Sequence, residues 1–329
     1  MVRLKWMMLS LVLVWVLLEA LLLGYRSVQR RRREPARSRK TVVCEAAPGA
    51  KESPEAEVLF HEIARFSTGL DRSRDIAARP DGQIVVAGDR RLRTFLPDGS
   101  ESGDIMLSSE PLCLATDSST NTYVGTQEGI LVYPAGSTNA AAWAKPTDDV
   151  RLTSLSVGPT GLFAADYGGR CVWQFNLSGR LLGRLGWRED AGKGPRFIVP
   201  TPHFDVVAGR NSVWVSNPGQ RRIQEYSFDG IFKREWGEGS QRIDAFCGRS
   251  NPGHFAILRD GRFVTSEKGL RRVKVYDAGG RFLGLVAPDG AFGRGSAGPP
   301  VAADCEGNVL ILDPETREVT VFQDRSDSR

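Results

Sequence analysis

A unit of about 40 to 50 residues recurs six times between about residue 56 and the C-terminus, and it limits the possible folds more than any other feature. Each unit contains a short apolar strand, a turn, a second apolar strand, a polar loop, a third strand that ends in an aromatic residue, a glycine turn and a fourth strand. The aromatic residues that end the third strand are Phe95, Tyr133, Phe175, Tyr226, Tyr276 and Phe322. Such a unit predicts one blade of a β-propeller.

The clearest copy covers residues 254–287. Its expected strands are 255–258, 262–266, 272–277 and 281–287, joined by turns rich in Gly and Asp that can adopt positive φ. The alternation in the third strand fits a strand with one buried face. Residues 56–329 are therefore expected to form an all-β, six-bladed β-propeller.

The last unit stops after its third strand, near Phe322, and an unassigned apolar stretch precedes the first unit. We expect residues 57–66 to supply the missing outer strand. This arrangement would join the two ends of the ring and protect the strand edges.

Two copies of the unit, SNPGQRRIQEYSFDG at 216–230 and SEKGLRRVKVYDAGG at 266–280, resemble NHL repeats. The pattern is an entry strand, Asp-Gly, a second strand ending near Asp or Asn, then Arg-Ile or Arg-Val and an aromatic residue. The resemblance implies an NHL-type propeller over nearly all of 57–324. NHL propellers include enzymes, receptors and scaffolds, so a function must be argued from a site.

The N-terminal residues 1–40 predict a single transmembrane signal-anchor. Residues from Trp6 to Leu23 are almost wholly apolar and just long enough to cross a bilayer, and a basic juxtamembrane run follows them. The positive-inside rule would keep the propeller in the cytoplasm, whereas anchored bacterial propellers are usually exported. We expect a propeller on the periplasmic or extracellular side. Residues 41–55 are expected to form a flexible linker.

The formal net charge of +5 is concentrated in the basic run, and the rest of the chain is close to neutral. This distribution argues against nucleic-acid binding. The five cysteines, Cys44, Cys113, Cys171, Cys247 and Cys305, have wide spacing and include no CxxC pair, so they predict neither a disulfide framework nor a zinc site. Cys113 and Cys305 align with inner strands, where a small buried thiol is expected.

The longest insertions, 186–203 and 237–254, fall on one face of the predicted ring, where second–third strand loops meet the connections between blades. Loops of this length in a tight repeat are often functional. Trp187, Trp236 and Phe197 lie in or near them, with Phe292 in a shorter insertion at 288–299. These aromatic residues could line a groove for a ligand, or pack between blades.

His203 and His254 are predicted to hold the same repeat position at the mouth of the central channel, with Asp75 and Ser154 as counterparts. Two imidazoles there could ligate a divalent metal such as Ca or Zn. In this respect the chain resembles the peptidyl-amidoglycolate lyases, a resemblance that implies histidine ligands. A third equivalent histidine is missing, and a hydrogen-bonded structural role is the alternative.

Cys247, Asn251, His254, Glu267 and Lys268 are predicted to surround one sector of the same face. A thiol, an imidazole and a carboxylate together could activate a nucleophile or coordinate an ion. Alternatively, these residues form turns, ion pairs and core. Calcium-dependent lactonase propellers need Glu, Asn and Asp ligands in the channel, for which Asn217, Asn251 and Asp166 are candidates.

The leading hypothesis is a membrane-anchored propeller that binds a protein or a small molecule on the face of the long loops, rather than an enzyme. A metal-dependent hydrolase or lyase with His203 and His254 as ligands is the first alternative. An accessory protein of a membrane redox complex, based on the anchor and Cys247, is the second.

Overall fold

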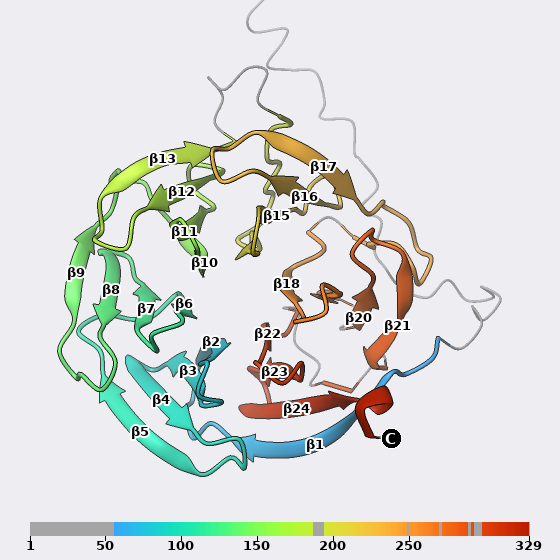
Figure 1. Cartoon of the computed structure of the whole chain (residues 1–329), viewed down its shortest axis with the longest axis horizontal. Coiled ribbons are helices and arrows are strands. Elements are labelled where there is room, and N and C mark those ends of the chain that lie inside the picture. The colour runs from blue at the N-terminus through green and yellow to red at the C-terminus, as the bar shows by residue number, and fades with distance from the viewer. Residues whose placement is uncertain are drawn as a thin grey trace, which may run out of the picture. The chain divides into compact units, whose positions relative to one another are not determined.

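Six four-stranded antiparallel sheets surround a central channel (Figure 1). The computed structural model describes residues 56–186, 194–248, 250–269, 272–288, 291–292 and 298–328. The predicted membrane anchor and linker therefore lie outside the described residues. Within these ranges no helix is both long enough and apolar enough to span a bilayer.

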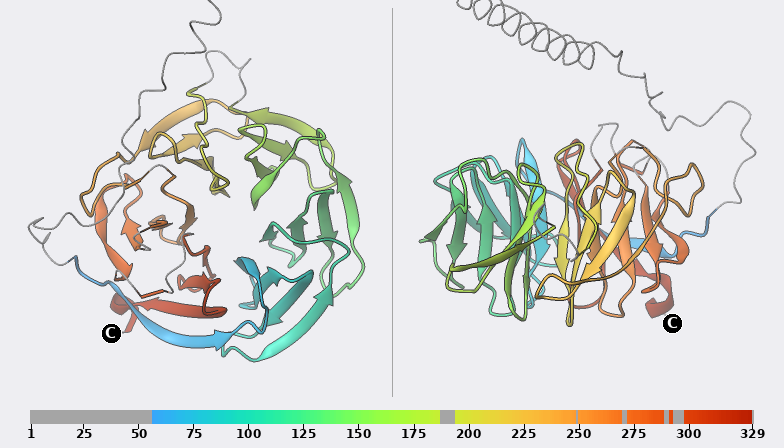
Figure 2. Two further views of the ribbon diagram at one scale, coloured as in Figure 1. Left: turned by 180° about the vertical axis from the view of Figure 1, so that it is seen from behind. Right: turned by 90° about the horizontal axis from the view of Figure 1, so that it is seen from above.

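Each blade follows the chain from the channel outward (Figures 1 and 2). Blade one is β2 (Ser73–Ala78), β3 (Ile84–Gly88), β4 (Arg91–Phe95) and β5 (Glu101–Met106). Blade two is β6 (Cys113–Thr116), β7 (Thr122–Gly125), β8 (Gly129–Tyr133) and β9 (Ala141–Ala144). Blade three is β10 (Leu152–Gly158), β11 (Gly161–Asp166), β12 (Cys171–Phe175) and β13 (Leu181–Leu185).

Blades four to six continue in the same order. Blade four is β14 (Val206–Ala208), β15 (Val213–Asn217), β16 (Arg222–Tyr226) and β17 (Phe232–Trp236). Blade five is β18 (His254–Ile257), β19 (Phe263–Ser266), β20 (Val273–Tyr276) and β21 (Phe282–Ala287). Blade six has β22 (Val301–Ala303), β23 (Val309–Asp313) and β24 (Glu318–Asp324), and a 3₁₀ turn, η1 (Arg325–Ser328), follows it.

The first strand of the described chain closes the ring. β1 (Phe60–Ser67) is the outer strand of blade six and pairs antiparallel with β24, from Phe60 opposite Asp324 to Ser67 opposite Glu318. The predicted closure by residues near 57–66 is confirmed. Because the two ends of the chain share one sheet, the sixth blade has four strands like the others.

The strand pattern follows from burial. The middle strands β3, β15 and β23 are buried along their whole length, because both of their faces pack against neighbouring blades. The outer strand β5 alternates between exposed and half-buried residues, as a strand with one solvent face does. The aromatic residues that end the third strands, among them Tyr226 and Tyr276, are almost fully buried.

Glycine is required at the turn before β21. Gly280 has a φ of +87°, and a Cβ there would lie 2.4 Å from the Trp236 ring. Any other residue would meet both a strained backbone and a steric clash. The Asp-Ala-Gly-Gly sequence therefore fixes the turn and lets blades four and five approach closely.

The cysteine predictions have two outcomes. Cys113 is fully buried on β6, as expected, but Cys305 is exposed in the turn after β22. The prediction for Cys305 was wrong because the inner strand of blade six ends at Ala303 and Asp304 begins a turn. Asp304 accepts hydrogen bonds from the backbone N–H groups of Glu306 and Asn308 in that turn.

Candidate functional site on the loop face and in the channel

We define the loop face as the ring face that carries the second–third strand turns and the connections between blades. The two long connections on it enter blades four and five. The described parts are 186 and 194–205 in the first connection, and 237–248 and 250–253 in the second. Each connection is held by its own buried side chain, which lies at the end of the second strand of the blade that the connection enters.

In blade four this side chain is Asn217. Its Oδ1 accepts a hydrogen bond from the Ile198 backbone N–H at 2.9 Å, and its Nδ2 donates to the Arg196 carbonyl at 3.0 Å. In blade three, Asp166 accepts from the Arg151 N–H at 2.8 Å. These bonds satisfy buried backbone groups, so the lactonase-like candidates Asn217 and Asp166 have a structural task.

Glu267 and Asn251 do the same in blade five. Glu267 Oε1 accepts from the Cys247 N–H at 3.1 Å. Asn251 Nδ2 donates to the carbonyls of Cys247 and Lys268, at 2.6 and 3.1 Å, and its Oδ1 accepts from the Lys268 N–H at 2.9 Å. The structure brings these predicted site residues together. Their hydrogen bonds join the connection to the second–third strand turn of blade five.

Glu267 also anchors a buried cluster of charges. Its Oε2 lies 3.1 Å from Arg272 Nε and 3.2 Å from Lys274 Nζ, and all three side chains are buried. Lys274 donates to the Ala245 carbonyl at 2.6 Å, and its Nζ lies 5.0 Å from the Phe246 ring centre. Burial lowers the pKa of Lys274 to about 8, and the Glu267 carboxylate acts against this shift.

The other predicted residues on this face do not form an open site. Cys247 is buried and disulfide-bonded, so its sulfur is not an available thiolate nucleophile. Trp236, Phe197 and Phe292 are buried and pack between and against blades, so the alternative reading of these aromatic residues is the correct one. Trp187 lies outside the described residues.

Strand register places one residue, within or directly before each inner strand, at an equivalent ring position in the channel. The ring position is occupied by Asp75, Cys113, Ser154, Asp205, His254 and Pro300. His203 lies two residues before Asp205, so the predicted equivalence of His203 and His254 is wrong. Asp205 and His254 each lie three residues before the last paired residue of the inner strand, which is Ala208 in blade four and Ile257 in blade five.

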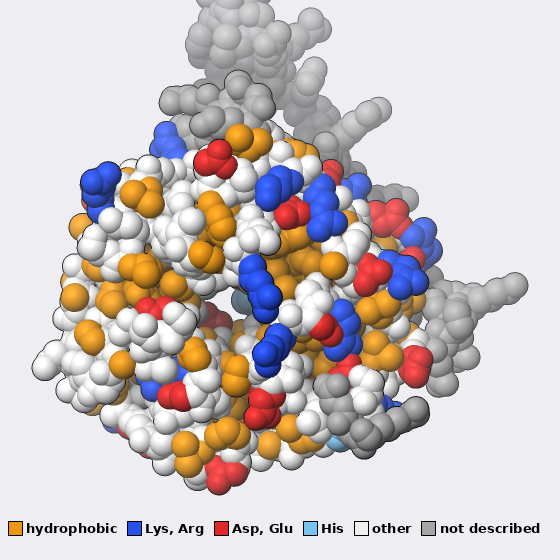
Figure 3. All heavy atoms as spheres, in the orientation of Figure 1, with side chains coloured by type: hydrophobic (Ala, Val, Ile, Leu, Met, Phe, Trp, Pro, Cys, Tyr) orange, Lys and Arg blue, Asp and Glu red, His pale blue; other side chains and the backbone are white. Residues whose placement is uncertain are grey.

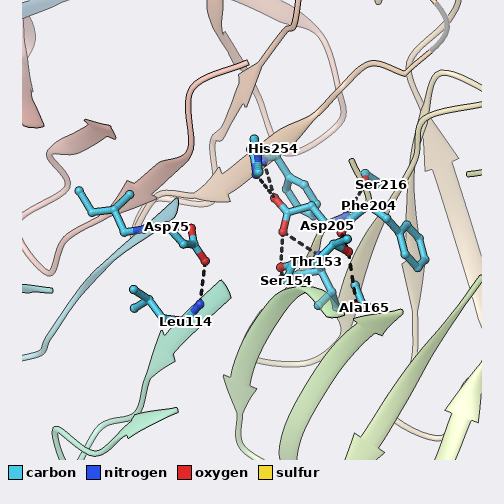
Figure 4. Close-up of polar contacts among 12 residues, drawn as sticks. Asp75, Leu114, Thr153, Ser154, Ala165, Phe204, Asp205, Ser216 and His254 are labelled. Carbon is cyan, nitrogen blue, oxygen red and sulfur yellow. Dashed lines mark hydrogen bonds and ion pairs between the residues drawn. The ribbon is translucent and has the colours of Figure 1, made fainter. Parts of the chain in front are cut away.

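Acidic side chains at the ring position join neighbouring blades (Figure 4). Asp205 accepts from the Ser154 hydroxyl of blade three and, through Oδ2, from the Phe255 N–H of blade five at 2.8 Å. Asp75 of blade one accepts from the Leu114 N–H of blade two at 2.8 Å. Both carboxyl groups face the channel, which holds a cavity of about 200 Å³.

Burial sets the pKa values of these carboxyl groups. It raises the pKa of Asp75 to about 7 and that of Asp205 to about 6, against the opposing effect of the hydrogen bonds that they accept. The negative charge of Asp205 adds to the shift of Asp75. The channel therefore contains two carboxyl groups that titrate near neutrality.

The two histidines lie next to this network. Their ring centres are 6.2 Å apart with nearly perpendicular planes, and His254 Nδ1 is 3.9 Å from Asp205 Oδ2. Burial lowers the pKa of both imidazoles to about 4, so both are neutral at pH 7 and the contact with Asp205 is not an ion pair. Neutral imidazole is the form that binds metals.

These residues do not complete a metal site. In the described ranges no three His, Cys, Asp or Glu side chains are grouped as metal ligands. The Asp205 oxygens already accept hydrogen bonds from Ser154, Val206 and Phe255. Metal ligation by His203 and His254 stays a prediction.

A pH titration tests the role of Asp75. A carboxyl group with a raised folded-state pKa contributes stability that is full below its unfolded pKa, near 4, and is lost as the pH rises through about 7. We expect the wild type to lose about 2 kcal/mol relative to Asp75→Asn between about pH 5 and pH 8. Urea unfolding of both full-length chains across this range measures the difference, and the histidines, common to both, cancel. Parallel pH curves would contradict the assignment.

The sequence interpretation missed Asp205 as a bridge. The signal was available, because Asp75-Ile76 and Asp205-Val206 both place an acid just before the first apolar residue of an inner strand. His203, two residues before Asp205, was predicted at the ring position instead.

Comparison with known proteins supports the fold alone. No family model matches the sequence, and no curated protein matches it. A streptogramin B lyase structure matches with a TM-score of 0.55 and 10% identity, covering 82% of this chain and 100% of that chain. A gluconolactonase from Xanthomonas campestris matches with a TM-score of 0.57 and 16% identity, covering 78% and 87%.

A WD40 propeller is equally similar. The WD40 β-propeller domain of Doa1 matches with a TM-score of 0.56 and 13% identity, covering 81% of this chain and 98% of that chain. At such identities both enzymes and WD40 domains share the architecture, so these likenesses do not select a function. The six-bladed propeller is confirmed, whereas membership of the NHL family stays a prediction.

Proposed function

We propose that this protein is a binding module whose contact surface is the loop face of blades four and five. The proposal rests on Ile198, whose backbone is held by hydrogen bonds while its side chain is exposed. Its N–H donates to Asn217 at 2.9 Å and its carbonyl accepts from the Gly219 N–H at 2.7 Å, yet 48% of the residue is exposed. A fixed backbone that presents an apolar side chain loses little entropy on binding.

Three buried polar side chains on the described part of this face already have partners. The polar atoms of Asn217, Asn251 and Glu267 are used in holding the connections, as shown above. The buried hydrogen bonds under two long loops hold these loops in one conformation, as a contact surface requires. A protein or small-molecule ligand that covers Ile198 is therefore the function best supported.

The experiment compares two exposed isoleucines on opposite faces. Ile198→Asp should reduce the amount of specific partner retained by the immobilised full-length chain from an extract of the source cells by about tenfold, because a charge in an apolar contact costs more than 1 kcal/mol. Ile231→Asp is the matched control, since Ile231 is 54% exposed in a turn on the opposite face. Identical sets of retained proteins for both variants and the wild type would reject the proposal.

We further propose that residues 6–23 anchor this module in a membrane with the propeller on the exported side. The apolar sequence of this segment supports the anchor. Protease accessibility of the propeller in intact cells, compared with lysed cells, tests the orientation. Resistance to protease until lysis would place the propeller in the cytoplasm.

The metal-dependent hydrolase or lyase and the redox accessory protein stay hypotheses. Elemental analysis of the purified full-length chain tests the first, because less than stoichiometric metal removes its basis.

A further inference from the structure

A second hollow lies on the face opposite the loop face, which we call the turn face because it carries the first–second and third–fourth strand turns. This cavity of about 890 Å³ is bordered by turns of blades two to five. Thr116, Val157, Val207 and Ile257 line both this cavity and the channel, so the two adjoin each other. Figure 3 views the turn face, where basic side chains lie at the central opening among hydrophobic ones.

The walls of this turn-face cavity are partly apolar. Val157, Val207 and Ile257 contribute half-buried side chains near the channel, and Leu177 is 52% exposed at the margin. An apolar body placed here would remove these surfaces from water.

The acidic side chains at the cavity have ion-pair or hydrogen-bond partners of their own. Glu225 is paired with Arg234 at 2.7 Å, and Asp260 with Arg262 at 2.6 Å. Asp117 accepts hydrogen bonds from its own turn, including the N–H groups of Ser119 and Asn121 at 2.9 Å each.

Two exposed arginines have no carboxylate partner among the described residues. Arg210, in the β14–β15 turn, makes no side-chain hydrogen bond or ion pair with them, and Arg259, in the β18–β19 turn, makes one long bond of 3.4 Å to the Cys305 carbonyl. Guanidinium groups bind carboxylates and phosphates through paired N–H donors. Two such groups from adjacent blades therefore line a partly apolar hollow with most of their donors unused.

We propose that the turn-face cavity binds a small amphipathic organic anion. Arg210 and Arg259 bind its carboxylate or phosphate, and its apolar body lies against Leu177 and the valines near the channel. This site is separate from the loop face, so the chain can carry a small acid on one face and a partner on the other.

The test uses 2-naphthoate and 1-naphthyl phosphate as anionic probes and 2-naphthamide as a neutral probe of similar size. Calorimetric titration of the full-length chain at low ionic strength should show saturable anion binding, about tenfold tighter than binding of the amide. The tighter of the two anions identifies the acid. Arg210→Gln/Arg259→Gln should weaken anion binding about tenfold and leave amide binding unchanged.

The controls separate the site from general charge. Arg180→Gln removes an exposed arginine that does not line the cavity and should leave binding unchanged. Leu177→Ser should weaken all three probes. Unfolding curves verify that each variant is folded. Equal affinity for anions and amide, unchanged binding in the double arginine variant, or no saturable binding of either anion up to several millimolar would overturn the proposal.

Discussion

Replacing Glu267 with asparagine should lower the free energy of unfolding by about 3 to 5 kcal/mol. The substitution leaves the buried cations of Arg272 and Lys274 without the carboxylate that lies within 3.2 Å of both. Removing one member of a buried ion pair costs more than the pair contributes, because the remaining charge stays desolvated. Urea unfolding of the full-length chain, followed by tryptophan fluorescence, measures the change.

Blade four supplies the matched control. At the positions of Glu267 and Lys274 it carries Asn217 and Gln224, a neutral pair in which Asn217 Nδ2 donates to Gln224 Oε1 at 3.2 Å. The double variant Glu267→Asn/Lys274→Gln copies this pair into blade five and should be more stable than Glu267→Asn alone by at least about 1 kcal/mol. If the double variant is no more stable than the single one, the buried charge is not the cause of the loss.

Asp205→Ala should cost about 3 kcal/mol or more. The carboxylate satisfies the Ser154 hydroxyl and the N–H groups of Val206 and Phe255, and these come from three consecutive blades. Each buried donor left without an acceptor costs about 1 to 3 kcal/mol. The same unfolding measurement tests this expectation.

Two further variants test whether the loss of stability comes from the hydrogen bonds between blades or only from the removal of a carboxylate. Asp98→Ala removes an exposed carboxylate that accepts from Ser100 in a turn, and should cost much less stability than Asp205→Ala. Ser154→Ala combined with Asp205→Ala should cost less than the sum of the two single variants, because both remove the same hydrogen bond. A loss for Asp205→Ala no larger than that for Asp98→Ala would show that the ring position does not tie the blades together.

The buried polar residues of the candidate site also stabilise the fold. Buried polar side chains are typical of catalytic sites, and they also satisfy the hydrogen bonds of buried backbone groups. Three such side chains are those of Asn217, Asn251 and Glu267. Asn217 and Glu267 accept hydrogen bonds from backbone N–H groups 19 and 20 residues earlier in the chain. The exposed residues Ile198, Arg210 and Arg259 are therefore the better guide to ligands.

Some features of this protein follow from local sequence alone. Six units with an aromatic residue at the end of the third strand determined the number of blades, and the short last unit determined that residues near 57–66 close the ring. These are periodic and local signals, which depend on side-chain alternation and turn chemistry. The strands predicted for 254–287 agree with β18 to β21 to within one residue.

The tertiary structure alone decided which polar residues share a site. The ring position is set by strand register, which placed Asp205, rather than His203, next to Ser154 and beside His254. The partners of Asn217 and Glu267, and the unpaired state of Arg210, depend on contacts between segments far apart in the chain. Sequence periodicity specifies the repeated backbone, but hydrogen-bond partners and exposure are settled only when the blades pack.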